Sequence, residues 1–128
     1  MSRKYLVLVF VLISATALVA AVSADWLTKV PERDRQKTNP YRDQPQAIQA
    51  GSLLFADHCA QCHGGSAEGT RKRPSLRTPR VQSQATEGDL HWLLANGNLR
   101  RGMPSWSKLP DQQLWQLISY LKSLKVPE

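Results

Sequence analysis

The stretch HCAQCHGG, His58 to Gly65, constrains this chain most, because it holds both cysteines of the 128-residue sequence. Cys59 and Cys62 are three positions apart, and His63 directly follows the second cysteine. Two cysteines this close serve three kinds of chemistry: a disulfide or redox pair, a zinc site, or the covalent attachment of haem. The rest of the sequence has to decide among them.

Residues 1–24 indicate export. Arg3 and Lys4 precede an uncharged run from Tyr5 to Ala24, which becomes rich in alanine before Asp25. A short basic region, an apolar core and small residues at its end predict a secretory signal peptide. The run also approaches the length of a helix that spans a bilayer, so an uncleaved anchor is the alternative. Either form places the rest of the chain in the periplasm.

The remaining chain is small and basic. Losing Arg3 and Lys4 with the first 24 residues lowers the formal charge from +7 to +5. The length allows one domain, whose core is marginal without a staple, a metal or a cofactor. An exported protein rarely meets nucleic acid, so we expect no nucleic-acid partner. The charge instead favours an acidic protein, or an anionic membrane surface.

The hydrophobic pattern predicts an all-α fold, because no stretch alternates as a β-strand does. Residues 25–44 are polar, charged and broken by Pro31 and Pro40. We therefore expect a linker or an extended arm there. Residues 45–128 form the predicted domain.

Three helices with long loops between them are predicted in that domain. The first begins near Pro45 and runs to Cys59, with apolar residues at helical spacing. The second follows Thr86 as N-cap and ends near Gly97. The third begins at Pro110 and carries a wide apolar stripe. Loops of a length that is usually functional separate these helices: Gly64–Ala85 and Asn98–Leu109.

Covalent haem attachment explains the cysteine motif best. A thioredoxin-like redox pair expects strands, and zinc needs four ligands where no second close pair exists. A disulfide across two residues would close a very small loop and stabilise little. C-x-x-C-H in an exported chain is the signature of c-type haem attachment. Cys59 and Cys62 point to one side of a helical turn and can reach two vinyl groups, while His63 is carried beneath the iron.

An electron carrier needs a second axial ligand, and Met103 is the candidate. Apart from Met1 it is the only methionine, and it lies between Gly102 and Pro104 rather than in a helical stripe. The alternative is a methionine that fills a gap in the core. His91 is the rival ligand, although we expect it to be a surface or partly buried histidine. Met/His ligation is a standard arrangement in cytochromes c.

These motifs resemble those of the small mono-haem bacterial cytochromes c, over about residues 44–125. The family has a glycine and an aromatic residue four apart in its first helix, matched by Gly51 and Phe55. It has an apolar residue and a tyrosine in its last helix, matched by Leu117 and Tyr120. The resemblance implies a cytochrome c fold in which these two helices cross at near right angles around one covalently bound haem c.

Two further residues are expected at the haem. The family has a Pro-x-Leu after the cysteine motif, and the resemblance implies that the carbonyl of Pro74 accepts the Nδ1 proton of His63. Arg73 departs from the family, which often carries glycine before this proline. Trp106 follows the Met-Pro turn, so we expect it either in the core or donating its indole N–H to a haem propionate.

The sequence therefore predicts a periplasmic electron carrier rather than an enzyme, with a dehydrogenase as donor or a terminal oxidase as acceptor. Membrane contact is expected only if residues 1–24 are retained. One alternative is a haem enzyme or gas sensor with an open distal position. Another is a cytochrome subunit of a dehydrogenase or oxidase complex. Basic residues of both long loops predict an acidic docking partner: Arg71, Lys72, Arg73, Arg77, Arg80, Arg100 and Arg101.

Overall fold

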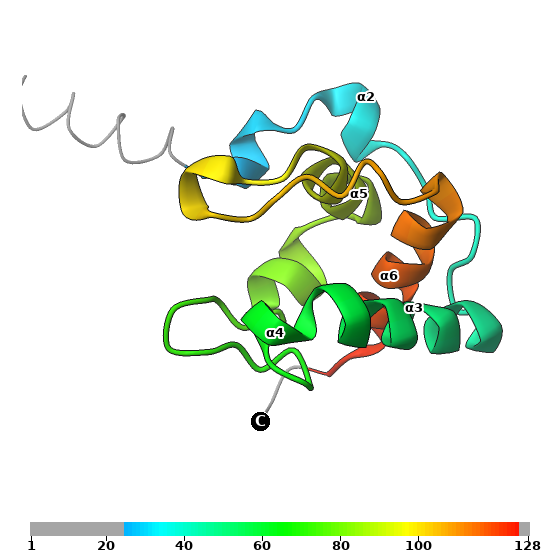
Figure 1. Cartoon of the computed structure of the whole chain (residues 1–128). Helices are drawn as coiled ribbons and strands as arrows, with labels where there is room; N and C mark the ends of the chain where they lie inside the picture. Colours follow the sequence, from blue (N-terminus) through cyan, green and yellow to red (C-terminus); the bar gives the residue numbers. More distant parts are fainter. Residues whose placement is uncertain (1–24, 126–128) are drawn as a thin grey trace, which may run out of the picture.

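The computed structural model describes residues 25–125, which form helices joined by loops, with one isolated β-bridge and no strand (Figure 1). The main helices are α3 (Pro45–His58), α5 (Glu87–Asn96) and α6 (Asp111–Ser123). The predicted all-α fold is confirmed. The expected signal peptide or anchor in residues 1–24 lies outside the described residues. Within the described range, no helix is long and apolar enough to cross a membrane.

The local sequence sets where the main helices begin and end. Pro45 occupies the first turn of α3, where its missing N–H costs nothing. Thr86 caps α5 in a reciprocal capping box with Asp89, whose N–H donates to the threonine hydroxyl at 3.0 Å. Gly97 ends α5 with a φ of +72°. The three predicted helices are thus confirmed.

Helices α3 and α6 form the most extensive helix pair and cross steeply (Figure 1). The crossing depends on Gly51, because a Cβ there would lie 2.0 Å from the backbone oxygen of Gln116. One turn further along α3, the rings of Phe55 and Tyr120 meet with centroids 5.3 Å apart. Glycine therefore permits the close approach, and the aromatic pair fills the space beside it.

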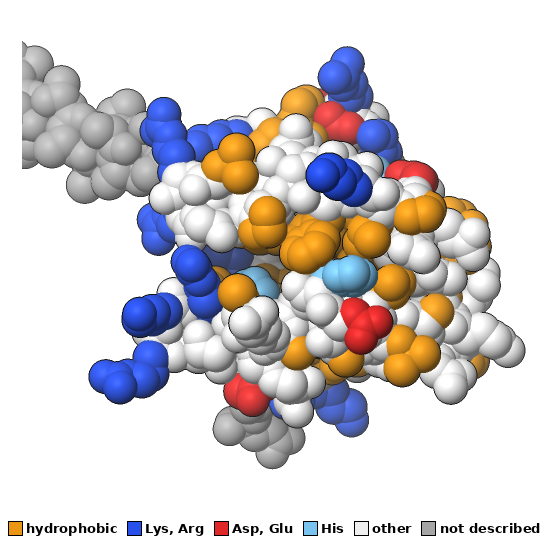
Figure 2. Space-filling view, viewed as in Figure 1, with side chains coloured by type: hydrophobic (Ala, Val, Ile, Leu, Met, Phe, Trp, Pro, Cys, Tyr) orange, Lys and Arg blue, Asp and Glu red, His pale blue; other side chains and the backbone are white. Residues whose placement is uncertain are grey.

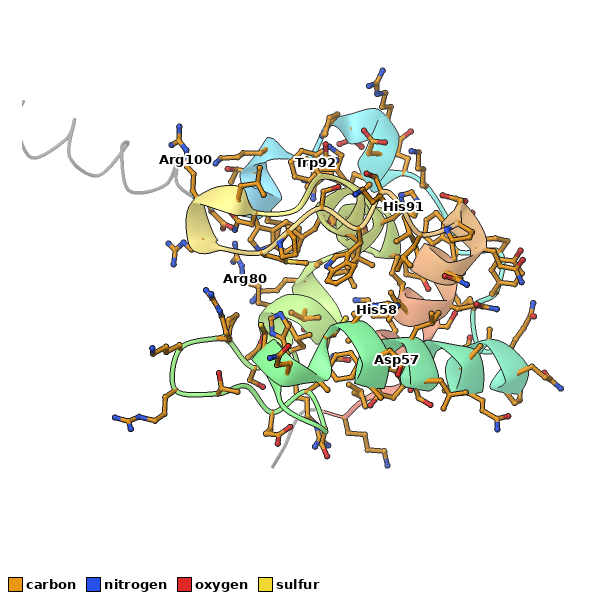
Figure 3. All side chains as sticks on the ribbon, in the orientation of Figure 1. Asp57, His58, Arg80, His91, Trp92 and Arg100 are labelled. Carbon is orange, nitrogen blue, oxygen red and sulfur yellow. The ribbon has the colours of Figure 1, made fainter. Side chains whose placement is uncertain are left out.

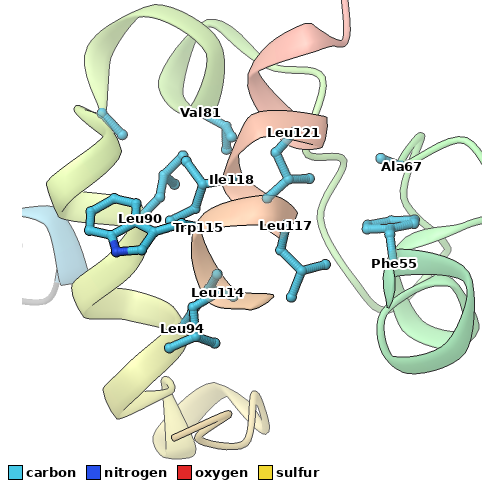
Figure 4. Close-up of a cluster of buried hydrophobic side chains, with 11 residues drawn as sticks. Phe55, Ala67, Val81, Leu90, Leu94, Leu114, Trp115, Leu117, Ile118 and Leu121 are labelled. Atoms are coloured by element: carbon cyan, nitrogen blue, oxygen red, sulfur yellow. The ribbon is translucent and has the colours of Figure 1, made fainter. Parts of the chain in front are cut away.

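The core lies where α5 and α6 meet, with α3 on the other side of α6 (Figure 4). Leu117 and Ile118 of α6 are almost fully buried, with Leu117 on the side of Phe55 and Ile118 on the side of α5 (Figure 4). Trp115 is also buried, as expected for a residue of the apolar stripe. Other members come from α5, α6 and the π-helical turn η2 (Arg80–Gln84): Val81, Leu90, Leu94, Leu114 and Leu121.

The segment before α3 is folded against the domain, in contrast to the linker or extended arm expected there. It forms the 3-10 turn η1 (Trp26–Lys29) and the short helix α2 (Glu32–Arg35), which packs on α5. Gly88 permits this contact, because a Cβ there would lie 2.1 Å from the oxygen of Asp34. Asn39 is buried and donates to the Ser119 hydroxyl of α6 at 2.9 Å. Polar residues hold this segment through long-range bonds that its composition does not reveal.

Candidate functional site

The two cysteines lie on one helical turn at the end of α3. The chain bends at Cys59 and continues into the short helix α4 (Ala60–His63), with the N–H of His63 bonded to the oxygen of Cys59 at 2.9 Å. Both thiols are free, Cys59 half-buried and Cys62 exposed. Burial raises the pKa of the Cys59 thiol to about 11, with a smaller contribution from the neighbouring Cys62. The side chains therefore share the geometry that the motif predicts.

His63 is oriented by Pro74. The Nδ1 atom of His63 lies 2.9 Å from the carbonyl oxygen of Pro74. A carbonyl oxygen can only accept, so Nδ1 carries the proton and the lone pair of Nε2 is left for another partner. This is the contact that the family resemblance implies.

The loop after α4 is tied back to the cysteine motif. Gly69, at a φ of +87°, donates its N–H to the oxygen of His63 at 2.6 Å. The hydroxyl of Thr70 donates to the oxygen of Cys62 at 3.1 Å, and its N–H donates to the oxygen of Arg73 at 3.0 Å. Arg73 itself has no positive φ. Its backbone therefore follows an ordinary path where the family often has glycine, and Pro74 is brought to His63.

Met103 lies in a tight turn within the second long loop. It exchanges two backbone hydrogen bonds with Asn98, of 2.9 and 3.1 Å, around the 3-10 turn η3 (Leu99–Arg101). Gly102 closes this turn in the left-handed region, at a φ of +80°. The Met103 side chain is half-buried and contacts the edge of the core. Its backbone is thus fixed, while its side chain is only partly covered.

His91, the rival ligand, is engaged elsewhere. It is buried rather than superficial, its Nε2 atom lies 2.7 Å from Oδ1 of Asp111, and its ring stacks on Trp115 at 4.1 Å. Trp115 donates its indole N–H to the other oxygen of Asp111 at 3.0 Å. His91 therefore joins α5 to α6 as part of the core.

Trp106 belongs to the second long loop and packs against the core. Its N–H donates to the oxygen of Leu94 at 2.8 Å, which fixes the loop after Met103 on α5. Its ring is half-buried, 5.3 Å from the ring of His58 at the end of α3. Within the described residues the indole N–H makes no hydrogen bond, so the expected bond to a propionate stays a prediction.

A hollow opens between the half of the molecule with α5 and residues 98–109 and the half with α4 (Figure 2). Hydrophobic and histidine side chains lie around it in that view. Figure 3 places His58 and Arg80 between the two halves, and His91 and Trp92 away from the hollow. Half-buried apolar side chains at the edge of the core come from both halves: Leu54, Leu76, Met103, Trp106 and Leu109.

Comparison with known families agrees with this geometry. Residues 46–121 match the family described as cytochrome c oxidase, cbb3-type, subunit III. The chain belongs to this family of c-type cytochromes. It is an electron-transfer cytochrome, and haem c is its cofactor.

Similar proteins include a cytochrome c550 and subunits of cbb3-type oxidases. The cytochrome is 32% identical to cytochrome c550 of Pseudomonas aeruginosa over 107 residues, 75% of this chain and 71% of the relative. It is also 32% identical to the cbb3-type cytochrome c oxidase subunit FixP of Rhizobium meliloti over 83 residues. That match covers 63% of this chain but only 29% of FixP.

A solved structure supports the same fold. Cytochrome cL of the marine methylotroph Methylophaga aminisulfidivorans superposes with a TM-score of 0.59 at 26% identity. The superposition covers 67% of this chain and 58% of cytochrome cL. The cytochrome fold is therefore shared, while much of the longer relatives lies beyond this chain.

The residues at the hollow fit haem c. Two free thiols three residues apart, one half-buried and one exposed, stand beside His63, whose Nε2 has no hydrogen-bond partner among residues 25–125. The apolar side chains at the edge of the core are only half-buried among the described residues. Their exposed surfaces could pack against the flat, largely apolar haem ring. Two thiols followed by an imidazole are the groups that covalent attachment of haem c uses.

One contact at this site was missed by reasoning from the sequence. Nη1 of Arg73 donates to the backbone oxygen of Arg101 at 2.7 Å and so joins the two long loops. The only signal in the sequence was the departure from the family at Arg73, which did not indicate a partner.

Proposed function

We propose that this cytochrome carries single electrons between redox proteins of the periplasm. Cys59 and Cys62 would form the thioethers, and His63 and Met103 would bind the iron. Bound haem would supply the one-electron redox chemistry. The observation that carries the proposal is the bond from His63 to Pro74, which leaves Nε2 as the ring nitrogen able to bind a metal.

The chain's own residues would then hold both ligands ready before and after transfer. Pro74 fixes the tautomer and the ring orientation of His63. Two backbone hydrogen bonds join Met103 to Asn98 and would hold the proposed thioether ligand in place. Ligands held in this way need little rearrangement when the charge on the iron changes, which suits electron transfer.

A second candidate is a cytochrome subunit held permanently in an oxidase or dehydrogenase complex. The family description and the match to FixP favour this candidate. Gel filtration of the native protein separates the two, because a carrier elutes as a small protein and a subunit elutes within its complex. A haem enzyme or gas sensor with Met103 off the iron is the third candidate, which the Met103 variant below tests.

An acidic partner fits the charge of the hollow's surroundings. Lys and Arg side chains gather at the side of the molecule with the hollow (Figure 2). Arg77 donates to the oxygen of Lys125, and Arg80 pairs with Asp25. Exposed basic residues lie in the loop after α4 and in the turn before Met103: Arg71, Lys72, Arg100 and Arg101. We propose that these four, the basic patch, meet an acidic surface on the redox partner.

Intact-mass measurement of the purified protein tests the attachment. The mass should exceed that of the polypeptide by one haem, and a thiol reagent should find no free cysteine, because both thiols are consumed. A protein without the adduct would contradict the proposal.

Replacement of Met103 tests the ligation. In Met103→Ala the cofactor should stay attached, while the reduction potential falls because a thioether favours the ferrous state. Carbon monoxide should bind the reduced variant readily. Leu99→Ala is the control, since Leu99 lies in the same loop and is 75% exposed. If the unmodified protein binds carbon monoxide as fast as Met103→Ala, Met103 is not the ligand and the sensor or enzyme candidate gains.

A further inference from the structure

We propose that Arg73 is a positioning residue that ties the Met103 loop to the His63 side of the hollow and so holds Met103 against competing ligands. The proposal rests on the proposed ligation by Met103. Arg73 is distinct from the basic patch, although it follows two of its members in the chain.

The side chain of Arg73 holds the turn directly before Met103. Nη1 donates to the oxygen of Arg101 at 2.7 Å. The guanidinium also covers Gly102, because a Cβ there would lie 3.0 Å from Nη2 and 3.1 Å from Nη1. Glycine at this position therefore serves both the left-handed turn and the approach of the arginine.

The backbone of Arg73 is anchored on the opposite side. Its oxygen accepts the N–H of Thr70 at 3.0 Å, and the hydroxyl of Thr70 is bonded to Cys62. The next residue is Pro74, which orients His63. One residue thus links the backbone that sets the proximal histidine to the turn that sets Met103.

A second tie lies on the other flank of Met103, where Trp106 contacts His58. Arg101 precedes Met103 by two residues and Trp106 follows it by three. The Met103 turn is therefore held from both sides, by Arg73 before the methionine and by Trp106 after it. If the Met103 turn opens on the side of Arg73, the hydrogen bond from Arg73 to the backbone oxygen of Arg101 must break.

Arginine suits this role better than lysine. Its planar fork can bond a carbonyl with one nitrogen while both terminal nitrogens lie over Gly102, and a lysine ammonium offers a single point of contact. Arg71 and Lys72 are exposed and make no side-chain hydrogen bond within the described residues. They therefore provide matched controls from the same loop.

The experiment compares Arg73→Gln and Arg73→Lys with the controls Arg71→Gln and Lys72→Gln in the haem-loaded protein. Amide hydrogen exchange is measured at Gly102 and Met103, and imidazole binding to the ferric protein is followed through loss of the long-wavelength Met–sulfur band. Arg73→Gln should speed exchange at both amides by roughly tenfold, because a hydrogen bond from a charged donor is lost. Imidazole should then displace Met103 at a lower concentration.

The exchange rates and the imidazole affinity of Arg73→Lys should lie between those of Arg73→Gln and the unmodified protein. Lysine keeps the positive charge but lacks the planar guanidinium. The controls should behave like the unmodified protein. Unchanged exchange or unchanged imidazole binding in Arg73→Gln would overturn the proposal, as would equal effects in the controls. Failure of Met103 as ligand shows separately, because the unmodified ferric protein would then lack the Met–sulfur band. Amide exchange reports on the tie between Arg73 and Arg101 with or without ligation by Met103.

Discussion

Asp89 lies at the start of α5 and is completely buried. Only one of its two carboxylate oxygens is hydrogen-bonded within the described residues. Its Oδ2 atom accepts the N–H of Thr86 at 2.8 Å and Nη1 of Arg35 at 3.2 Å. Its Oδ1 atom has no hydrogen-bond partner among the described residues. Arg35 also donates to the oxygen of Leu27, so it fastens the N-terminal segment to α5. The charge on Asp89 therefore depends on Arg35.

Arg35→Met should destabilise the protein, because it leaves a buried carboxylate without its cation. The free energy of unfolding in urea should fall by roughly 1–3 kcal/mol; breaking a fully buried pair costs more, but Arg35 is 31% exposed and water can take its place in part. Arg33→Met is the control, since Arg33 is 87% exposed, and it should change the unfolding free energy by less than about 0.5 kcal/mol. Equal effects of the two variants would show that the pair with Asp89 contributes nothing.

Single residues could be predicted from the sequence where covalent spacing alone places them. Cys59, Cys62 and His63 occupy one helical turn, so their mutual geometry follows from their positions. Arg73 meets Arg101 across 28 residues of chain. The spacing of residues cannot reveal a contact of that kind, because it depends on the path of two loops.

At the scale of helices, the crossing of α3 and α6 is the contact most sensitive to a small change. Gly51→Ala should cost about 3 kcal/mol or more, because the new methyl group would lie 2.0 Å from the oxygen of Gln116 and the helices must separate. Thermal unfolding followed by circular dichroism measures the effect.

Gly65→Ala is the matched control for the crossing. A Cβ at Gly65 meets nothing within 4 Å, and its φ is not positive, so stability should change by less than about 0.5 kcal/mol. A Gly51→Ala protein as stable as Gly65→Ala would mean that the crossing can relax freely.

The helices α3, α5 and α6 were predictable because each is bounded by residues with a local effect: Pro45, the Thr86 capping box and Gly97. The turn η2 was not, because it depends on Lys122 of α6. Nζ of Lys122 donates to the oxygens of Val81 and Ala85, each at 2.7 Å, and burial lowers its pKa. An amphipathic pattern marks α6 as a helix but cannot show that one of its lysines binds a distant turn.

At the scale of the whole molecule, the sequence gives the amount of charge but not its distribution. The basic patch gathers only because the fold brings the loop after α4 and the turn η3 to the same side of the molecule (Figure 1). The fold also engages Arg73 and Arg77 in hydrogen bonds to backbone oxygens and Arg80 in an ion pair with Asp25, so these side chains are less available to a partner. A test of docking should therefore alter the exposed residues and leave Arg73 in place.

The last prediction concerns electrostatic steering by this patch. The cytochrome should be oxidised faster at low salt by the anion hexacyanoferrate(III), and the rate should fall steeply towards ~0.15 M salt, where the Debye length is about 8 Å. The cation tris(phenanthroline)cobalt(III) should show the opposite trend, because the patch repels it. Stopped-flow measurement of the second-order rate constants gives both trends.

Reversal of Arg71 and Lys72 to glutamate should lower the rate constant for oxidation by hexacyanoferrate(III) several-fold at low salt. It should also flatten the salt dependence of that rate constant. The control reverses Arg33 and Lys37 of the N-terminal segment, which produces the same change in net charge on the α2 side, away from α4 (Figure 1). Steering by the patch predicts a large effect for the first pair and a small one for the second, with unchanged absorption spectra in both. Equal effects would mean that net charge alone sets the rate, and no effect in either would mean that electrons leave through a surface remote from the patch, where apolar contact rather than charge guides the partner.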